Sequence, residues 1–395
     1  MEDIKFGFWN YAPYGILGVE QVARWKDSGF NLPMSFRYVE GESKRQDVLT
    51  LLDACKDADL PLLMNDDRLN FRRLGTLGKE AYFDVVKTVH REYGDHPSVY
   101  GFYVGDEPQP DETQMAIDAY RLIQREMPSK KHFLNLLPYW GSADPFLECG
   151  KQTPEEFENL LRKILVSTDA PYIGFDHYTQ CLQDGQNQED GVATYFYDLD
   201  EYCKITKEKG IPFYVSLLAV GHWLYRSPSA DDIRWQISTA FAHGARGIIW
   251  FYYYQTDLDL SFHDTPFGGK ALRCNDASFQ MIANEMQRFL ERYQRYFNRM
   301  ELVKAMHFGH LYDPQHRFVA DSVVTHLEAK LPYPVCVSYY RDLYEDRIYV
   351  SLVNLDFAHS NHWSVTLANG KTLSTYLAPG EMALLDPQEA CFLGA

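Results

Sequence analysis

The stretch Val99-Tyr-Gly-Phe-Tyr-Val-Gly-Asp-Glu-Pro108 is the most informative part of the chain. An almost continuous apolar run ends in two acidic residues and a proline. Such a run is typical of a strand whose two faces are both buried, as in a parallel sheet covered by helices. The amphipathic segment 111–126 supplies a helix directly after it. Together these two segments predict one β-then-α unit.

Similar units precede and follow this stretch between residue 4 and about residue 298. The expected strands are 4–10, 34–39, 61–65, 99–105, 132–137, 172–176, 212–219 and 247–253. The expected helices are 20–28, 45–58, 80–93, 111–126, 154–167, 195–209, 230–243 and 277–297. Eight such units predict a closed (β/α)8 TIM barrel. An open doubly wound sheet is the alternative, but no Gly-x-Gly-x-x-Gly follows the first strand.

The sequence pattern changes after Arg299. Segments 335–340, 347–354 and 362–367 alternate apolar and polar residues, and turn signals such as Asn369-Gly370 separate the later ones. We therefore expect an α/β barrel over residues 1–298 and a small all-β domain of the β-sandwich type over residues 299–395. A structural cap against the barrel is the simplest role for this second domain, and a binding module is the alternative.

Composition excludes several classes of partner. The formal net charge is −17, which argues against nucleic acid and anionic membranes, because both require a basic surface. The seven cysteines form no Cys-x-x-Cys pair and indicate reduced thiols. Without a signal peptide or a long apolar run, a cytoplasmic protein is expected, although a secreted form with its leader trimmed has the same appearance. A monomer and a homo-oligomer fit the composition equally well.

The polar residues at the strand ends indicate the chemistry, because active sites of such barrels lie at the carboxyl ends of the strands. Asp106 and Glu107 end the fourth strand, where buried carboxylates are costly without partners. Glycoside cleavage requires an acid with a raised pKa and a second group that manages the anomeric cation. The structural alternative is that Asp106 caps the next helix and Glu107 forms a loop ion pair.

The Gly-Asp-Glu-Pro ending, preceded by His-Pro-Ser-Val-Tyr-Gly-Phe-Tyr, resembles barrel glycoside hydrolases of the clan typified by β-galactosidases and cellulases. This resemblance covers the barrel and implies that Glu107 is the acid/base, with Asp106 in the place of the clan's asparagine. Arg37 matches the arginine that follows the second strand in that clan. Trp250 matches the tryptophan that forms a sugar platform on the eighth strand.

The resemblance fails at the seventh strand, which reads Phe213-Tyr-Val-Ser-Leu-Leu-Ala-Val-Gly-His-Trp223 and has no acid where the clan carries its nucleophile. In one alternative, Asp176 or Asp66 supplies the second carboxylate, and its distance from Glu107 decides between retention and inversion. The other alternative resembles substrate-assisted N-acetylhexosaminidases, in which an Asp-Glu pair ends the fourth strand. Asp106 then orients the substrate's acetamide, and the Tyr178 hydroxyl binds the acetamide carbonyl.

Aromatic and amide side chains follow several strands and suit a pocket for sugar rings. Besides the residues above, the predicted substrate contacts are Trp9, Tyr11, Asn65, Asn135, Tyr139, Trp140, His177, Trp223 and Tyr252. No three or four metal ligands cluster at the strand ends, so we expect neither a metal nor a cofactor. The sequence thus predicts a hydrolase of O-glycosidic bonds in an oligo- or polysaccharide. A non-catalytic carbohydrate-binding barrel is the third alternative.

Overall fold

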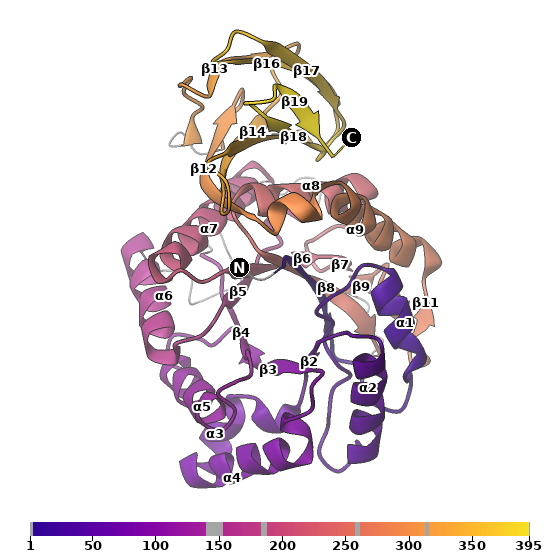
Figure 1. Ribbon diagram of the computed structural model, residues 1–395. Coiled ribbons are helices and arrows are strands. Elements are labelled where there is room, and N and C mark those ends of the chain that lie inside the picture. The colour runs from indigo at the N-terminus through magenta and orange to yellow at the C-terminus, as the bar shows by residue number, and fades with distance from the viewer. Residues whose placement is uncertain (1–2, 140–152, 183–187, 257–260, 313–315, 395) are drawn as a thin grey trace.

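The computed structural model describes residues 3–139, 153–182, 188–256, 261–312 and 316–394. A ring of strands is surrounded by helices, and a separate group of strands packs against one side of this barrel (Figure 1). Within these ranges, no helix is long and apolar enough to cross a membrane.

The inner ring consists of parallel strands. They are β1 (Lys5–Asn10), β2 (Leu62–Met64), β3 (Val99–Asp106), β4 (Phe133–Leu136), β5 (Ile173–Asp176), β6 (Phe213–Leu218) and β8 (Gly247–Gln255). Each pairs in parallel with its neighbour from β2 to β8, and β1 pairs with β8 to close the other side. The predicted TIM barrel is confirmed.

The expected strand over 34–39 forms only isolated bridges, although it fills the gap between β1 and β2. Met34 bridges Leu63 and Tyr38 bridges Asp66. Side chains replace part of the regular ladder here, because the Ser35 hydroxyl accepts from the Asn65 amide at 2.8 Å. The barrel therefore closes without a continuous second strand.

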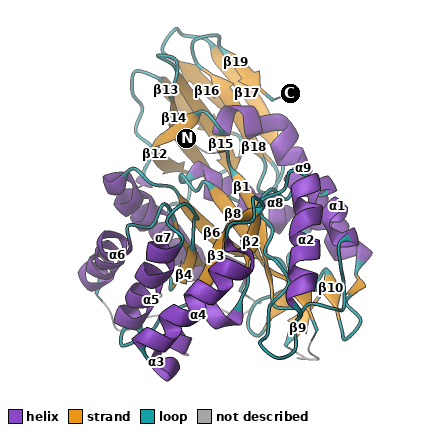
Figure 2. Cartoon of the chain, turned by 60° about the horizontal axis from the view of Figure 1, so that its bottom comes forward, coloured by secondary structure: helices purple, strands orange, loops and turns teal. Residues whose placement is uncertain are grey.

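The outer layer consists of helices that surround the ring (Figure 1) and flank the strands in the turned view of Figure 2. The described helices are α1 (Glu20–Asp27), α2 (Arg45–Asp57), α3 (Arg72–Leu77), α4 (Lys79–Val89), α5 (Thr113–Glu126), α6 (Pro154–Thr168), α7 (Gln188–Lys209), α8 (Ala230–Ala242) and α9 (Asp276–Phe297). Short turns are η1 (Asp67–Leu69), η2 (His90–Gly94) and η3 (Thr179–Cys181). Short strands in the loops are β7 (Gly221–His222), β9 (Phe262–His263), β10 (Phe267–Gly268) and β11 (Arg273–Cys274).

Strand residues alternate between the inside of the barrel and the helix layer, as the two-residue period of a strand requires. In β1, Phe8 belongs to the core between strands and helices, whereas Trp9 belongs to the cluster inside the barrel. Tyr103, Phe133 and Tyr214 extend that inner cluster around the ring. The centre of the barrel is therefore packed with aromatic rings below the carboxyl ends of the strands.

The residues after α9 form two antiparallel sheets. Their strands are β12 (Met300–Phe308), β13 (Val324–Ala329), β14 (Val335–Asp342), β15 (Ile348–Asn354), β16 (Asn361–Leu367), β17 (Thr372–Leu377), β18 (Met382–Asp386) and β19 (Cys391–Leu393). The orders are β12-β14-β15-β18-β19 and β13-β16-β17. Residues of both sheets share one apolar core, which confirms the predicted β-sandwich.

The sandwich packs against α8 and α9. The Trp235 indole of α8 donates to the carbonyl of Leu355 at 3.0 Å, and the Tyr293 hydroxyl of α9 donates to the carbonyl of Met382 at 2.6 Å. Apolar residues of β14, β15 and β18 join the barrel's outer core. The two parts thus share a continuous buried interface.

Candidate active site at the carboxyl ends of the strands

An irregularity near the end of β3 directs Asp106 into the barrel mouth. The pairing with β4 shifts between Tyr103 and Gly105, so one extra residue lies on β3 and Asp106 comes to face Asn135. Such a bulge re-aims the side chains that follow it. Gly105 has φ 148°, and a Cβ there would approach the Phe71 ring to 2.3 Å. Glycine is therefore required at this bend.

Glu107 follows in a strained backbone conformation. Its φ is 42°, in the left-handed region that costs a non-glycine residue on the order of 1–3 kcal/mol. Its amide donates to the Asn135 carbonyl at 3.1 Å, which holds this turn against β4. Strain retained at a polar strand end is a feature of functional sites, where it fixes the direction of a side chain.

Asn135, at the end of β4, joins two of the predicted acids. Its Nδ2 donates to Asp106 Oδ1 at 2.9 Å and to Asp176 Oδ1 at 2.7 Å. Asp176 ends β5 opposite Ser216 of β6 and is almost fully buried. Three adjacent strands therefore bring Asp106, Asn135 and Asp176 together, as the sequence predicted for these strand ends.

Asp176 also contacts Glu107, and their side chains are hydrogen-bonded to each other. Burial, and then the charges of Glu107 and Asp106, raise the pKa of Asp176 well above its usual range. Neighbouring like charges in a buried place cannot both ionise readily, so the pair retains a proton that an isolated carboxyl group would have lost. The sequence allowed this contact but did not require it.

The pKa of Asp106 is also raised, to about 6. Burial is the main cause, and hydrogen bonds from Asn135 and Tyr11 and the nearby charge of Arg72 act in the opposite direction. The cluster thus holds three carboxyl groups in a poorly solvated space at the mouth of the barrel.

Aromatic side chains surround these acids. Trp9 lies edge-on to Tyr103 with ring centroids 5.1 Å apart, and its indole donates to Ser216 Oγ at 3.0 Å. Tyr11 contacts the Tyr252 ring at 5.3 Å, and its hydroxyl lies 3.5 Å from Asp106 Oδ2. Trp9 and Tyr252 are buried in the inner core, whereas Tyr11 is partly exposed and can present its ring to the apolar face of a sugar.

Tyr178 and Trp223 extend the aromatic surface. Tyr178 stacks on Phe251 at 5.3 Å, and the charges of Asp176, Asp106 and Glu107 contribute to the raised pKa of its hydroxyl. Trp223 stacks on His222 at 4.3 Å, and 70% of it remains exposed. Trp223 is therefore the predicted contact that is most accessible to a ligand.

Arg37 lies at the rim. It forms an ion pair with Asp67 at 2.7 Å and stays about half-exposed. The hydrogen-bonded ion pair with Asp67 is the main cause of the raised pKa of Arg37. The Arg37 backbone amide donates to the Ala12 carbonyl at 2.8 Å, which places it beside the segment that follows β1.

Two other predicted contacts point away from the acids. His177 is fully buried, with Nδ1 2.7 Å from Asp198 Oδ2 and Nε2 2.5 Å from Thr179 Oγ1. Tyr139 packs between Phe157 and Tyr197 in the helix layer. These contacts give His177 and Tyr139 positioning roles within the scaffold, in place of the predicted substrate contacts.

The predicted sugar-platform role of Trp250 is wrong. Its indole donates to Met286 Sδ of α9 at 3.1 Å, and the side chain is fully buried in the outer core. Ile249 precedes it on the inner face of β8, so the alternation of the strand turns Trp250 outward. Tyr252 takes the inward position near the barrel mouth.

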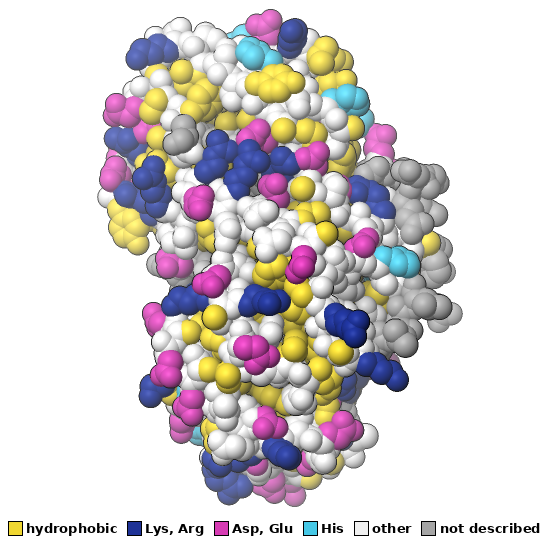
Figure 3. All heavy atoms as spheres, turned by 90° about the vertical axis from the view of Figure 1, so that its right-hand side faces the viewer, with side chains coloured by type: hydrophobic (Ala, Val, Ile, Leu, Met, Phe, Trp, Pro, Cys, Tyr) yellow, Lys and Arg dark blue, Asp and Glu magenta, His cyan; other side chains and the backbone are white. Residues whose placement is uncertain are grey.

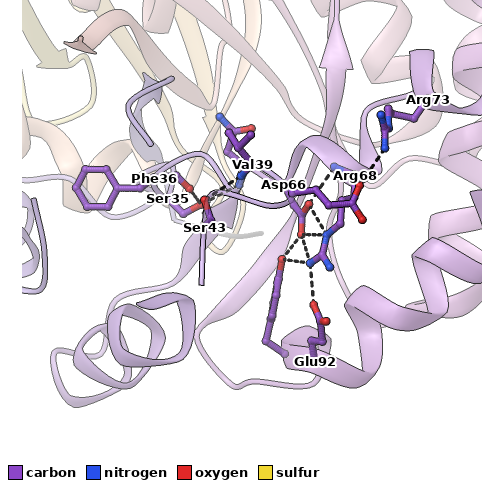
Figure 4. Close-up of polar contacts among 11 residues, drawn as sticks. Ser35, Phe36, Val39, Ser43, Asp66, Arg68, Arg73 and Glu92 are labelled. Carbon is purple, nitrogen blue, oxygen red and sulfur yellow. Dashed lines mark hydrogen bonds and ion pairs between the residues drawn. The ribbon is translucent and has the colours of Figure 1, made fainter. Parts of the chain in front are cut away.

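Asn65 and Asp66 also serve the scaffold. Asn65 Nδ2 donates to the Asn10 carbonyl at 2.7 Å, which links β1 to the end of β2. Asp66 accepts hydrogen bonds from the Arg68 backbone amide, from Arg68 Nε and Nη2 and from the Tyr93 hydroxyl. Arg68 Nη2 also binds Glu92 at 2.8 Å (Figure 4). Asp66 is therefore not the second carboxylate. Trp140 lies outside the described residues.

The end of β6 carries no acid. Leu218 and Val220 point into the barrel there, and Ser216 binds the Trp9 indole.

The structure adds Arg72 to the site, which sequence reasoning missed. Arg72 pairs with Glu112 at 2.7 Å and lies near Asp106. Arg72 does not lie at the end of a predicted strand, so the sequence offered no reason to place it near Asp106. Only the folded structure brings the two residues together.

The raised carboxyl pKa values predict a pH-dependent cost in stability. An unfolded aspartate titrates near pH ~3.9, whereas Asp106 titrates at about 6 in the folded chain. The folded state therefore binds protons more tightly, and its stability falls as the pH rises through this interval. We expect Asp106→Asn and Asp176→Asn to lose less stability than the native chain between pH 4.5 and pH 7.5.

Urea unfolding at several pH values checks this expectation. Asp346→Asn, which changes an exposed loop residue, is the matched control and should follow the native curve. If the stability of both site variants fell with pH as steeply as that of the native chain, the pKa values of Asp106 and Asp176 would not be raised in the folded state.

Comparisons with known proteins support the fold. No protein-family model matches the chain, and no curated protein sequence matches it. Among solved structures, a GH42 β-galactosidase from G. stearothermophilus covers 97% of this chain and 98% of its own, at 9% identity and a TM-score of 0.64. The likeness therefore extends over the β-sandwich as well as the barrel.

Two further β-galactosidases match a smaller share of the chain. Those from Marinomonas ef1 and Halorubrum lacusprofundi each cover 73% of this chain, at 10% and 12% identity and TM-scores of 0.53 and 0.52. This chain spans 60% and 58% of their lengths. At such low identities the likeness establishes the shared architecture, and it confirms the resemblance to barrel glycoside hydrolases at the level of the fold.

Proposed function

We propose that this protein is a glycoside hydrolase in which Glu107 is the general acid and Asp176 is the second carboxylate. The observation that carries this proposal is the direct contact between the two side chains at the carboxyl ends of β3 and β5. β6 offers no acid among its described residues, so Asp176 takes the part that a carboxylate on that strand would otherwise have.

The shared proton gives this pair its chemistry. A proton held between the two carboxyl groups can be passed from Glu107 to the glycosidic oxygen as the bond breaks. Asp176 is then left ionised, where its charge stabilises the anomeric cation or directs a nucleophile. Asn135 holds Asp176 through its amide in both states, because an amide donor binds the ionised carboxylate as well.

The contact also constrains how substrate enters. Carboxyl groups lie about 5–5.5 Å apart in retaining enzymes and about 6.5–9.5 Å apart in inverting enzymes. Glu107 and Asp176 are hydrogen-bonded to each other, so a sugar bound between them would separate the two carboxyl groups toward one of these ranges. Asp176 is almost fully buried and held by the Asn135 amide, so it keeps its place as the sugar binds.

The surroundings favour a neutral sugar. Three acids at the mouth repel carboxylated or sulfated sugars, and the exposed ring of Trp223 offers an apolar face for stacking. Acidic and basic side chains are intermingled on the face shown in Figure 3, which has no extended basic field for an anionic polymer.

Substrate assistance is the second candidate function, and the position of Tyr178 favours it. This hydroxyl lies near Asp106, Asp176 and Glu107, where an acetamide carbonyl could accept its proton. Asp106 would then orient the acetamide nitrogen, and the sugar's own oxygen would attack the anomeric carbon.

A panel of aryl glycosides with and without a 2-acetamido group distinguishes these functions. Turnover of plain hexosides or pentosides, with release of the free sugar, is expected for the Glu107–Asp176 pair. Turnover confined to 2-acetamido sugars would replace that mechanism with substrate assistance. If no glycoside were hydrolysed while oligosaccharides still bound, the protein would be a carbohydrate-binding barrel and the proposal would fail.

A further inference from the structure

A cluster of metal-binding side chains is buried far from the strand ends, where the β-sandwich meets the barrel. His243 follows α8, His307 lies on β12 and Cys336 lies on β14. One ligand atom from each lies within 4.8 Å of the others, and all three side chains are buried. These residues are far apart in sequence, and the docking of the sandwich on α8 brings them together.

The hydrogen bonds of His243 prepare it to bind a cation. Its Nδ1 lies 2.9 Å from the Thr239 carbonyl, which can only accept, so Nδ1 carries the proton. Its Nε2 therefore presents a lone pair, and this atom faces Nε2 of His307 at 3.2 Å. Metal-bound histidines usually donate their second ring nitrogen to a carbonyl or carboxylate in this way.

His307 has little else to bind. It is fully buried, and its Nδ1 has no hydrogen-bond partner among the described residues. A buried polar group without partners is costly. A cation at the facing Nε2 atoms would offset that cost by binding both imidazoles at once.

The spacing fits a tetrahedral ion. With metal–nitrogen bonds of about 2.05 Å, two ligands at tetrahedral angles lie roughly 3.3 Å apart. The observed Nε2–Nε2 distance is 3.2 Å. Two imidazoles and a thiolate form a borderline-soft ligand set, which favours Zn²⁺ over Mg²⁺ or Ca²⁺.

A further histidine, His316, lies beside these three residues on the side nearer to solvent. The His316 ring lies 5.3 Å from that of His307 and 6.4 Å from that of His243. His316 forms an ion pair with Asp200 of α7, and their side chains are 16% and 27% exposed. An ion can therefore reach the buried residues from this side.

We propose that His243, His307 and Cys336 bind Zn²⁺, with His316 completing the tetrahedron and Asp200 orienting His316. The ion would join α8 of the barrel to β12 and β14 of the sandwich. With every ligand supplied by protein, the site is closed in the manner of structural zinc sites, and its role is to stabilise the docking of the two parts. This inference is independent of the proposed glycosidase activity.

Cobalt substitution tests the site in the full chain. After dialysis against a chelator, the folded protein should take up one equivalent of Co²⁺ with the intense visible bands of a tetrahedral ion and a thiolate-to-cobalt band in the near ultraviolet. Added Zn²⁺ should abolish these bands and raise the melting temperature, as a ligand specific to the native state does.

Cys336→Ser should lose the thiolate-to-cobalt band, and His307→Gln should weaken binding of Co²⁺ at least tenfold. Cys391→Ser and His326→Gln change an exposed cysteine and an exposed histidine elsewhere in the sandwich and should retain both signals. A folded native chain that neither retains zinc nor shows the cobalt bands would overturn the proposal, even if the site variants failed to fold. Bands that survive in Cys336→Ser would overturn it as well.

Discussion

Glu107→Gln should lower kcat/KM for a glycoside with a poor leaving group by about 10²–10⁴. Glutamine keeps the size of the side chain but cannot give a proton to the departing oxygen. A strongly acidic phenol leaves without that proton, so the same variant should hydrolyse dinitrophenyl glycosides with a much smaller loss. A series of aryl glycosides that spans a range of phenol pKa values measures this dependence directly.

The companion variant Asp176→Asn separates the roles of the two acids. Its loss of kcat/KM should be similar for good and poor leaving groups, because stabilisation of the anomeric centre is needed with every aglycone. Glu80→Gln, on the exposed first turn of α4, controls for the change of a glutamate and should act like the native enzyme. Equal losses in Glu107→Gln across the whole aryl series would contradict its role as the acid.

Asp66→Ala should lower the free energy of unfolding by about 3–5 kcal/mol, the range observed when one partner of a buried ion pair is removed. The Arg68 side chain is 7% exposed and binds Asp66 Oδ2 at 2.8 Å, so the substitution leaves a buried guanidinium with Glu92 as its remaining anionic partner. Chemical denaturation at pH 7 measures the change.

Asp67→Asn is a matched control in the adjacent position. Its partner Arg37 is 43% exposed, and such surface pairs contribute about 0–1 kcal/mol. The folded fraction of Asp66→Ala should also keep the native kcat, since Asp66 faces Arg68 and Tyr93 (Figure 4). A large fall in kcat with unchanged stability would show that Asp66 has a catalytic role after all.

The barrel was predictable because its signals are local. Each strand is a short apolar run and each helix an amphipathic segment, and the side-chain period within each follows from backbone geometry alone. The segment 34–39 was the exception, since side-chain hydrogen bonds take the place of ladder bonds there: Ser35 Oγ accepts from the Asn65 backbone amide and Asn10 Nδ2 donates to the Met34 carbonyl. The apolar content of a segment does not reveal whether side-chain hydrogen bonds will replace the backbone hydrogen bonds of a strand.

The site was predictable in part. Asp106, Glu107, Asn135 and Asp176 end neighbouring strands, and parallel strands in a barrel bring their carboxyl ends to one face. Trp250 was assigned through its resemblance to a clan tryptophan. Side chains alternate between the two faces of a strand. Because Ile249 faces the inside of the barrel, the next residue, Trp250, must face outward.

The sequence by itself determined the order of β-then-α units, the all-β character of the last part and the pair of acids that ends β3. These features depend on residues close together in the chain. Only the tertiary structure decided that Asp176 contacts Glu107, that Asp66 pairs with Arg68, and that His243, His307 and Cys336 meet. Such contacts depend on the bulge in β3, the closure of the barrel and the docking of the sandwich, and each of these is set by packing between distant segments.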